Sequence, residues 1–146
     1  MEIINHGVGS VRPGPTGVGG WLLVLCAWLL AWQPIGLGLT ASRIVSQIAF
    51  RGLPLALALA ARVMVTGLGI AAGIALAGRR PGAVTLARAA VIASAAADVA
   101  MYSTTYFPSN RMPGDTPLYV TAALLYHGAW VAYLHRSKRV QKTFGG

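Results

Sequence analysis

The sequence predicts an all-α membrane protein built as a bundle of four transmembrane helices. Its 146 residues are 55% hydrophobic and only 10% charged, whereas a soluble domain carries about 25% charged residues. The three acidic residues, Glu2, Asp98 and Asp115, are too few to cover a water-facing surface. Four apolar segments are each long enough to cross a bilayer core, which takes about 20 helical residues. An open sheet is excluded because its edge groups would stay unpaired in lipid.

Turn-forming residues separate the four segments. The predicted spans are residues 18–40, 53–77, 83–106 and 117–134, and the breaks at 78–82 and 108–115 are rich in Gly and Pro. Residues 1–17 contain Pro13-Gly14-Pro15 and no apolar core of their own, so we expect an N-terminal segment and no cleaved signal. Residues 135–146 form a basic tail.

The stretch between the first two spans has two interpretations. Ile44, Val45 and Ile48 recur at helical spacing, while Arg43 and Gln47 fall elsewhere. Residues 41–52 could form a short helix that lies flat in the membrane interface. They could equally extend a neighbouring span.

Basic residues predict the orientation of the chain. Four spans place both termini on one side, and the tail and the loop at 78–82 share that side. Only Arg43, Arg51 and Arg111 lie opposite. Because basic residues concentrate in cytoplasmic loops, we expect both termini in the cytoplasm.

The net charge of +9 does not indicate nucleic acid, because the basic residues flank apolar runs. Their placement predicts contact with anionic lipid or with a membrane-protein partner at the inner surface. The candidate contact residues are Arg136, Lys138, Arg139, Lys142, Trp21, Trp130 and Tyr133. The cluster has two interpretations, a simple topology anchor or a docking point.

Two motifs at the ends of the chain resemble a known family. Gly19-Gly20-Trp21-Leu22 opens the first span. Trp130, Tyr133, Ser137-Lys138-Arg139-Val140 and Thr143-Phe144 close the chain. These ends are similar to those of the bacterial inner-membrane family called domain of unknown function 2569. The resemblance implies a small helical inner-membrane protein and brings no activity, cofactor or catalytic residues.

Two ionisable residues inside the spans predict an ion pair. Counted along the helices at about 1.5 Å per residue, Arg62 and Asp98 lie about 13 and 12 Å below the same outer edge. Their spans are consecutive and antiparallel, and their charges are opposite. Because charged groups in lipid are costly, we expect them to meet.

Other polar residues are predicted at the same level and form an intramembrane polar layer with the pair. They are Gln33, Ser94, Tyr102 and His127. Pro34, beside Gln33, predicts a kink in the first span. One interpretation is that the layer only holds the helices together. The other is a ligand or proton site, for which Asp98 is the stronger candidate as the only acidic residue within a span.

No catalytic, metal or cofactor site is expected. Aspartic chemistry needs two carboxylates where the spans hold one, and the single cysteine, Cys26, forms no pair. We therefore expect a non-enzymatic subunit, scaffold or regulator of a larger membrane assembly, with a homo-oligomer as one form of it. The alternative is a small transporter or ion-coupled carrier that uses Arg62, Asp98 and His127.

Overall fold

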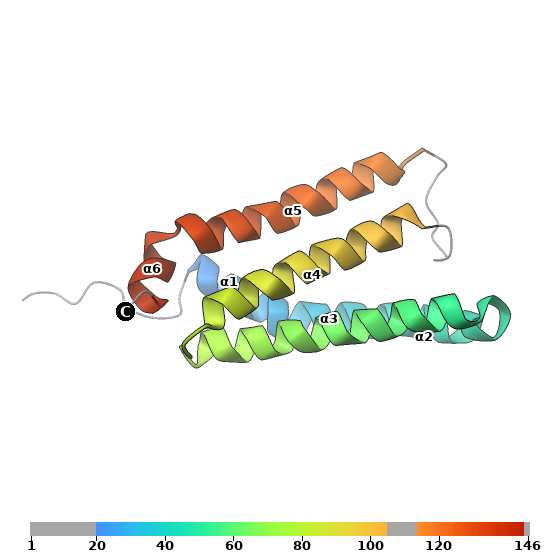
Figure 1. Cartoon of the computed structure of the whole chain (residues 1–146), viewed down its shortest axis with the longest axis horizontal. Helices are drawn as coiled ribbons and strands as arrows, with labels where there is room; N and C mark the ends of the chain where they lie inside the picture. Colours follow the sequence, from blue (N-terminus) through green and yellow to red (C-terminus); the bar gives the residue numbers. More distant parts are fainter. Residues whose placement is uncertain (1–19, 105–113, 145–146) are drawn as a thin grey trace, which may run out of the picture.

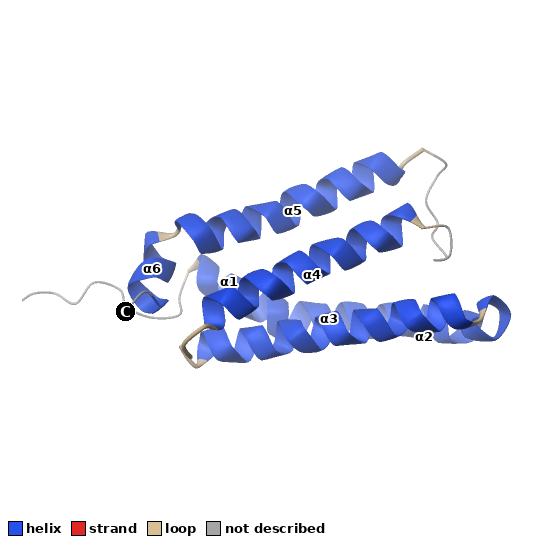
Figure 2. Ribbon diagram, in the orientation of Figure 1, coloured by secondary structure: helices blue, strands red, loops and turns tan. Residues whose placement is uncertain are grey.

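The structure is a computed structural model that describes residues 20–104 and 114–144. The described residues form helices joined by short turns (Figure 2). The predictions made for residues 1–17 and for most of the 108–115 turn lie outside this part of the chain.

The first helix is longer than predicted. It runs without a break through α1 (Trp21–Ala27), a π-helical turn η1 (Trp28–Trp32) and α2 (Gln33–Arg51). Residues 41–51 therefore extend the first span, and the alternative of a separate interfacial helix is wrong. The physical reason is that no helix breaker stands between Thr40 and Arg51, and Ile44, which is 2% exposed, anchors this part of the helix.

The π-helical turn lies directly before Pro34. The N–H of Gln33 bonds to the carbonyl of Trp28, five residues earlier, in place of the usual four. Proline has no N–H to donate, and its ring crowds the carbonyl four residues before it. A wider turn relieves that crowding and keeps the backbone bonded. The disturbance predicted at Pro34 thus takes the form of one π turn.

A single residue joins α2 to α3 (Leu53–Ala77). Gly52 has φ 68°, a conformation that glycine adopts without steric cost. Pro54 follows in the first turn of α3, where its missing N–H has no helical partner to lose. The two helices form a tight hairpin, at the right end of Figure 1.

A Schellman motif ends α3 and starts the turn to α4 (Ala83–Ser103). The N–H of Arg80 bonds to the carbonyl of Ala75 at 2.9 Å, and that of Arg79 to Leu76 at 3.2 Å. Arg79 has φ 50° and Gly82 has φ 77°. The turn lies where the sequence predicts it.

The basic tail is folded back onto the bundle. α5 runs over Thr116–Arg136, and α6 over Lys138–Phe144. Ser137 separates them, and its Oγ accepts the N–H of Val140 at 3.4 Å. Val140 is 2% exposed, and Phe144 packs against the core. Residues 138–144 of the predicted basic tail thus form a helix whose Val140 and Phe144, one helical turn apart, pack against the bundle.

The long helices pack side by side in the order α2, α3, α4, α5, with α6 across one end (Figure 1). α1 and η1 pack against α3 as well. We call the end with α6 and the 78–82 turn the inner end, and the end with Gly52 the outer end. These names follow the predicted orientation.

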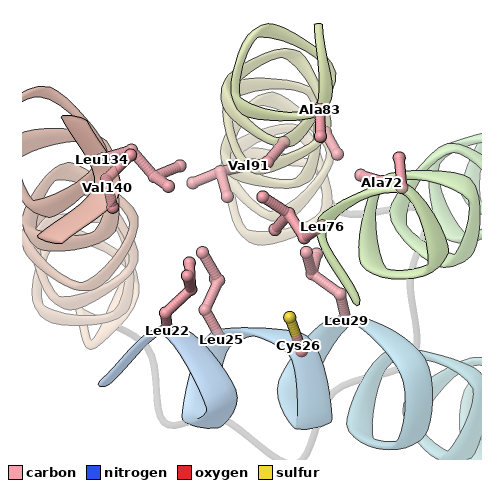
Figure 3. Close-up of a cluster of buried hydrophobic side chains, with 13 residues drawn as sticks. Leu22, Leu25, Cys26, Leu29, Ala72, Leu76, Ala83, Val91, Leu134 and Val140 are labelled. Atoms are coloured by element: carbon pink, nitrogen blue, oxygen red, sulfur yellow. The ribbon is translucent and has the colours of Figure 1, made fainter. Parts of the chain in front are cut away.

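The apolar core lies toward the inner end, where α1 and η1 face the other helices (Figure 3). Leucines from the first helix meet alanines of α3 and α4, so that the backbones approach closely. The labelled side chains are Leu22, Leu25, Cys26, Leu29, Ala72, Leu76, Ala83, Val91, Leu134 and Val140.

Within residues 20–104 and 114–144, three helices are long and apolar enough to cross a membrane. They are Trp21–Phe50, Leu53–Ala77 and Ala83–Ser103. Their length and composition suggest a multi-pass membrane protein. α5 is 21 residues long, as α4 is. It is less apolar because it carries three tyrosines and two histidines.

Candidate functional site in the polar layer

The ion pair between Arg62 and Asp98 forms. Nη1 of Arg62 on α3 lies 2.6 Å from Oδ1 of Asp98 on α4, and Arg62 donates. The side chains are 21% and 19% exposed. Charge-assisted hydrogen bonds of this length are among the stronger polar contacts in proteins. The pair ties the two central helices together.

His127 brings α5 to the same carboxylate. Its Nε2 lies 3.6 Å from Oδ2 of Asp98, and its Nδ1 lies 2.8 Å from the carbonyl of Ala123. The residue is 4% exposed. Asp98 on α4 thus lies next to the guanidinium of Arg62 on α3 and the imidazole of His127 on α5.

Gln33 and Ser94 make the second link in the layer. Nε2 of Gln33 donates to Oγ of Ser94 at 2.7 Å, and Ser94 in turn donates to the carbonyl of Ala90 at 2.8 Å. Because the only proton of Ser94 is used, the amide nitrogen of Gln33 must be the atom that faces it. Oε1 of Gln33 is buried without a hydrogen-bond partner. It lies against Gly69, where a Cβ would clash with it.

The layer spans two levels and not one. Gln33 is the first residue of α2, whose 19 residues span about 28 Å. It therefore lies far below the outer end, because the helix continues beyond the predicted end at Thr40. Ser94 stands one turn inward of Asp98 on α4. Gln33 and Ser94 form the inner level, and Arg62, Asp98 and His127 the outer one.

Tyr102 lies one turn outward of Asp98, toward the outer end of α4. Its ring is 5.7 Å from that of Tyr119 on α5, with the planes tilted by 44°. This contact links the outer parts of α4 and α5. Tyr102 therefore belongs to the predicted layer by its place next to Asp98 on α4, and it also contacts Tyr119 on α5.

A cavity of about 140 Å³ opens beside the layer. Arg62, Gln33 and Ser94 supply its polar wall. Trp28, Trp32, Gly36 and Tyr126 complete the lining. A second cavity, of about 220 Å³, extends from Arg62 along α3 and α4 to Pro54 and Thr104. Arg62 lines both spaces.

Aromatic side chains enclose His127. The ring centroids of Trp28 and Tyr126 lie 5.7 and 5.3 Å from the imidazole. Sequence reasoning did not place these two residues, or Gly69, in the site. Aromatic and glycine residues inside an apolar span give no pattern that separates them from core. The only sequence signal near these residues was Pro34, which follows Gln33 and predicts a kink.

The inner contact residues lie around α5 and α6. Trp21 packs edge-on against Trp130 with centroids 6.4 Å apart, and Trp130 against Tyr133 at 6.1 Å. Together with Tyr126 and Ala129 they line a groove of about 310 Å³. Arg136, Lys138 and Lys142 are exposed, while Arg139 is half-buried and reaches Gly20.

Arg88 forms an inner link that the sequence did not reveal. Its Nη2 donates to the carbonyl of Leu134 at 3.1 Å, and its Nε is buried without a hydrogen-bond partner. The bond joins α4 to the last turn of α5.

Across residues 20–104 and 114–144, no three His, Cys, Asp or Glu side chains cluster as a metal site would need.

The family model described as "Protein of unknown function (DUF2569)" matches residues 15–145. This match confirms the resemblance carried by the two ends of the chain. No curated protein and no solved structure matches.

Proposed function

The chain belongs to the DUF2569 family of proteins of unknown function, and because that membership carries no activity, we propose a function from the residues themselves. We propose a protein of the bacterial inner membrane that crosses it four times with both termini in the cytoplasm. It serves as a non-enzymatic subunit, scaffold or regulator of a larger membrane assembly.

One observation carries this proposal: the polar layer joins the protein's own helices. Asp98 contacts both Arg62 and His127, and Gln33 contacts Ser94, so α2, α3, α4 and α5 are linked at mid-bundle. Such contacts hold a bundle in one arrangement. Rigid, well-packed helices suit a protein that presents fixed surfaces to a neighbour.

The aromatic groove at the inner end is the surface that we assign to a partner. Trp21 is 68% and Tyr126 45% exposed along it. Large aromatic side chains are enriched at protein interfaces. We propose that a transmembrane helix of a partner protein lies in this groove, above the exposed basic residues of α6.

A photo-crosslinking amino acid at Ala129, in the groove, tests the proposal. The matched control carries it at Ile74, which is 53% exposed on the inner half of α3. We expect one protein adduct of defined mass from Ala129 in native membranes and only lipid adducts from Ile74. An adduct with a second copy of the chain would indicate a homo-oligomer. Lipid adducts alone at both positions would end the subunit proposal.

The second candidate function is a small proton- or ion-coupled carrier. The two cavities favour it, because Arg62 lines the one that reaches Gln33 and Ser94 and also the one that extends to the outer end. Purified protein in liposomes with a pH-sensitive dye inside tests it. A carrier would move protons or ions faster than the Asp98→Asn variant does. Equal rates in both would remove this candidate.

A further inference from the structure

The hydrogen bond at Nδ1 of His127 fixes which ring nitrogen carries a proton. The carbonyl of Ala123 is an acceptor only, so Nδ1, at 2.8 Å, must donate to it. In a neutral imidazole only one nitrogen carries a hydrogen. Nε2 of a neutral His127 would therefore present a lone pair.

That lone pair would face a carboxylate. Oδ2 of Asp98 lies 3.6 Å from Nε2, and Nε2 is buried with no hydrogen-bond partner. Two acceptors facing each other in a buried site repel, and the low local dielectric strengthens the repulsion. A proton between the two atoms converts the repulsion into attraction.

We propose that His127 and Asp98 form a proton-binding site that holds one proton between Nε2 and Oδ2. Arg62 decides where the proton resides. Its guanidinium donates to Oδ1 at 2.6 Å, a charge-assisted hydrogen bond of the kind made to a carboxylate. The proton therefore sits on Nε2, and His127 is an imidazolium ion.

The charged side chains that face the site are Asp98 and Arg62. Asp98 is faced by Arg62 from α3 and by His127 from α5, and α2 contributes only the neutral amide of Gln33 through Ser94. The centroids of Trp28 and Tyr126 lie within 5.7 Å of the imidazole. Both rings are steeply inclined to the imidazole, at 66° and 89°, and they enclose the site.

The cavity beside Arg62 gives the layer room for water. Its volume of about 140 Å³, with Arg62, Gln33 and Ser94 in its wall, exceeds what one water needs. Water at this position would let the proton exchange. Loss of the proton would remove the contact between α4 and α5 at mid-bundle while leaving the Arg62 contact intact. The inference does not depend on which proposed function is right.

Nitrogen NMR of the full chain in lipid nanodiscs, with labelled histidine, tests the site. His127→Gln identifies the signal by its absence, and His135→Gln serves as the matched control because His135 is exposed on the same helix. We expect both ring nitrogens of His127 to carry protons at neutral pH. In Asp98→Asn we expect a neutral ring protonated at Nδ1 alone.

The wild-type spectrum tests the proposed proton-binding site by itself if the Asp98→Asn variant fails to fold. Two protonated ring nitrogens on His127 at neutral pH support the site. A neutral ring protonated at Nε2 would mean that His127 simply donates to Asp98 and holds no extra proton. A neutral ring at neutral pH, unchanged by Asp98→Asn, would also overturn the proposal.

Discussion

The side-chain amide of Gln33 occupies the space that Gly69 leaves on α3. A Cβ on Gly69 would overlap Oε1 of Gln33, whereas Nε2 of the same amide reaches across to Ser94 on α4. The side chain of Gln33 on α2 is thus held between helices α3 and α4. The contact depends on the absence of a side chain at position 69.

Gly69→Ala is therefore expected to destabilise the bundle by about 1–3 kcal/mol, since overpacking a tight contact costs that much. Gly67→Ala is the matched control. Gly67 lies on the exposed side of α3 with open space around its Cα, and alanine should stabilise the helix there by up to about 1 kcal/mol. Unfolding in mixed detergent measures both. Equal stability of the two variants would show that Gln33 moves aside at no cost.

Arg62 and Asp98 are expected to be coupled in a double-mutant cycle. Arg62→Gln removes the hydrogen bond to Oδ1 of Asp98, and Asp98→Asn leaves Arg62 without its counter-charge, each at a cost of about 1–3 kcal/mol. The double variant should lose less than the sum, by about 0.5–3 kcal/mol, because neither charge is then stranded. The same unfolding assay applies. Strictly additive losses would argue that the two side chains do not interact.

The basic residues of the tail are expected to bind anionic lipid. Arg136, Lys138, Arg139 and Lys142 lie at the inner end, and each is worth about 1 kcal/mol near an anionic surface. Replacing all four with Gln should reduce the anionic lipid retained in native mass spectrometry. Arg43→Gln, at an exposed position on α2, should leave it unchanged. A quadruple variant that keeps its lipids but loses a crosslinked partner would instead identify α6 as a protein docking element.

Both termini are expected in the cytoplasm. The motivation is the excess of basic residues at the 78–82 turn and the tail over those at the outer end. A C-terminal fusion to a fluorescent protein that matures only in the cytoplasm should fluoresce. A fusion to alkaline phosphatase, which is active only in the periplasm, should stay inactive, and the reverse pattern would invert the topology.

Some contacts of the layer follow from counting residues, and others do not. Arg62 and Asp98 could be paired because both belong to helices whose shared turn, at 78–82, is marked by Gly and Pro. Gln33 was placed too close to the outer end because Ala41 to Arg51 carries polar residues yet continues the helix. Trp28 and Tyr126 gave no signal, since aromatic side chains in apolar spans are as often core as site.

The fold of the tail illustrates a second limit. Val140 and Phe144 are four residues apart, and Ser137 stands where a helix cap belongs, so the elements of α6 were present in the sequence. The charges of Lys138, Arg139 and Lys142 predicted contact with anionic lipid or a partner and gave no sign of packing against α4 and α5. Short helices of seven residues depend on packing for stability. That packing becomes visible only when α4 and α5 are in place.

The single-residue link at Gly52 has a consequence for biogenesis. Because only one residue lies between α2 and α3, we expect the two helices to enter the bilayer together as a hairpin. The insertion machinery then recognises a pair of helices and not two successive signals. A short epitope placed at Gly52 should block insertion of both helices at once, whereas the same epitope between Arg80 and Pro81 should leave them in place.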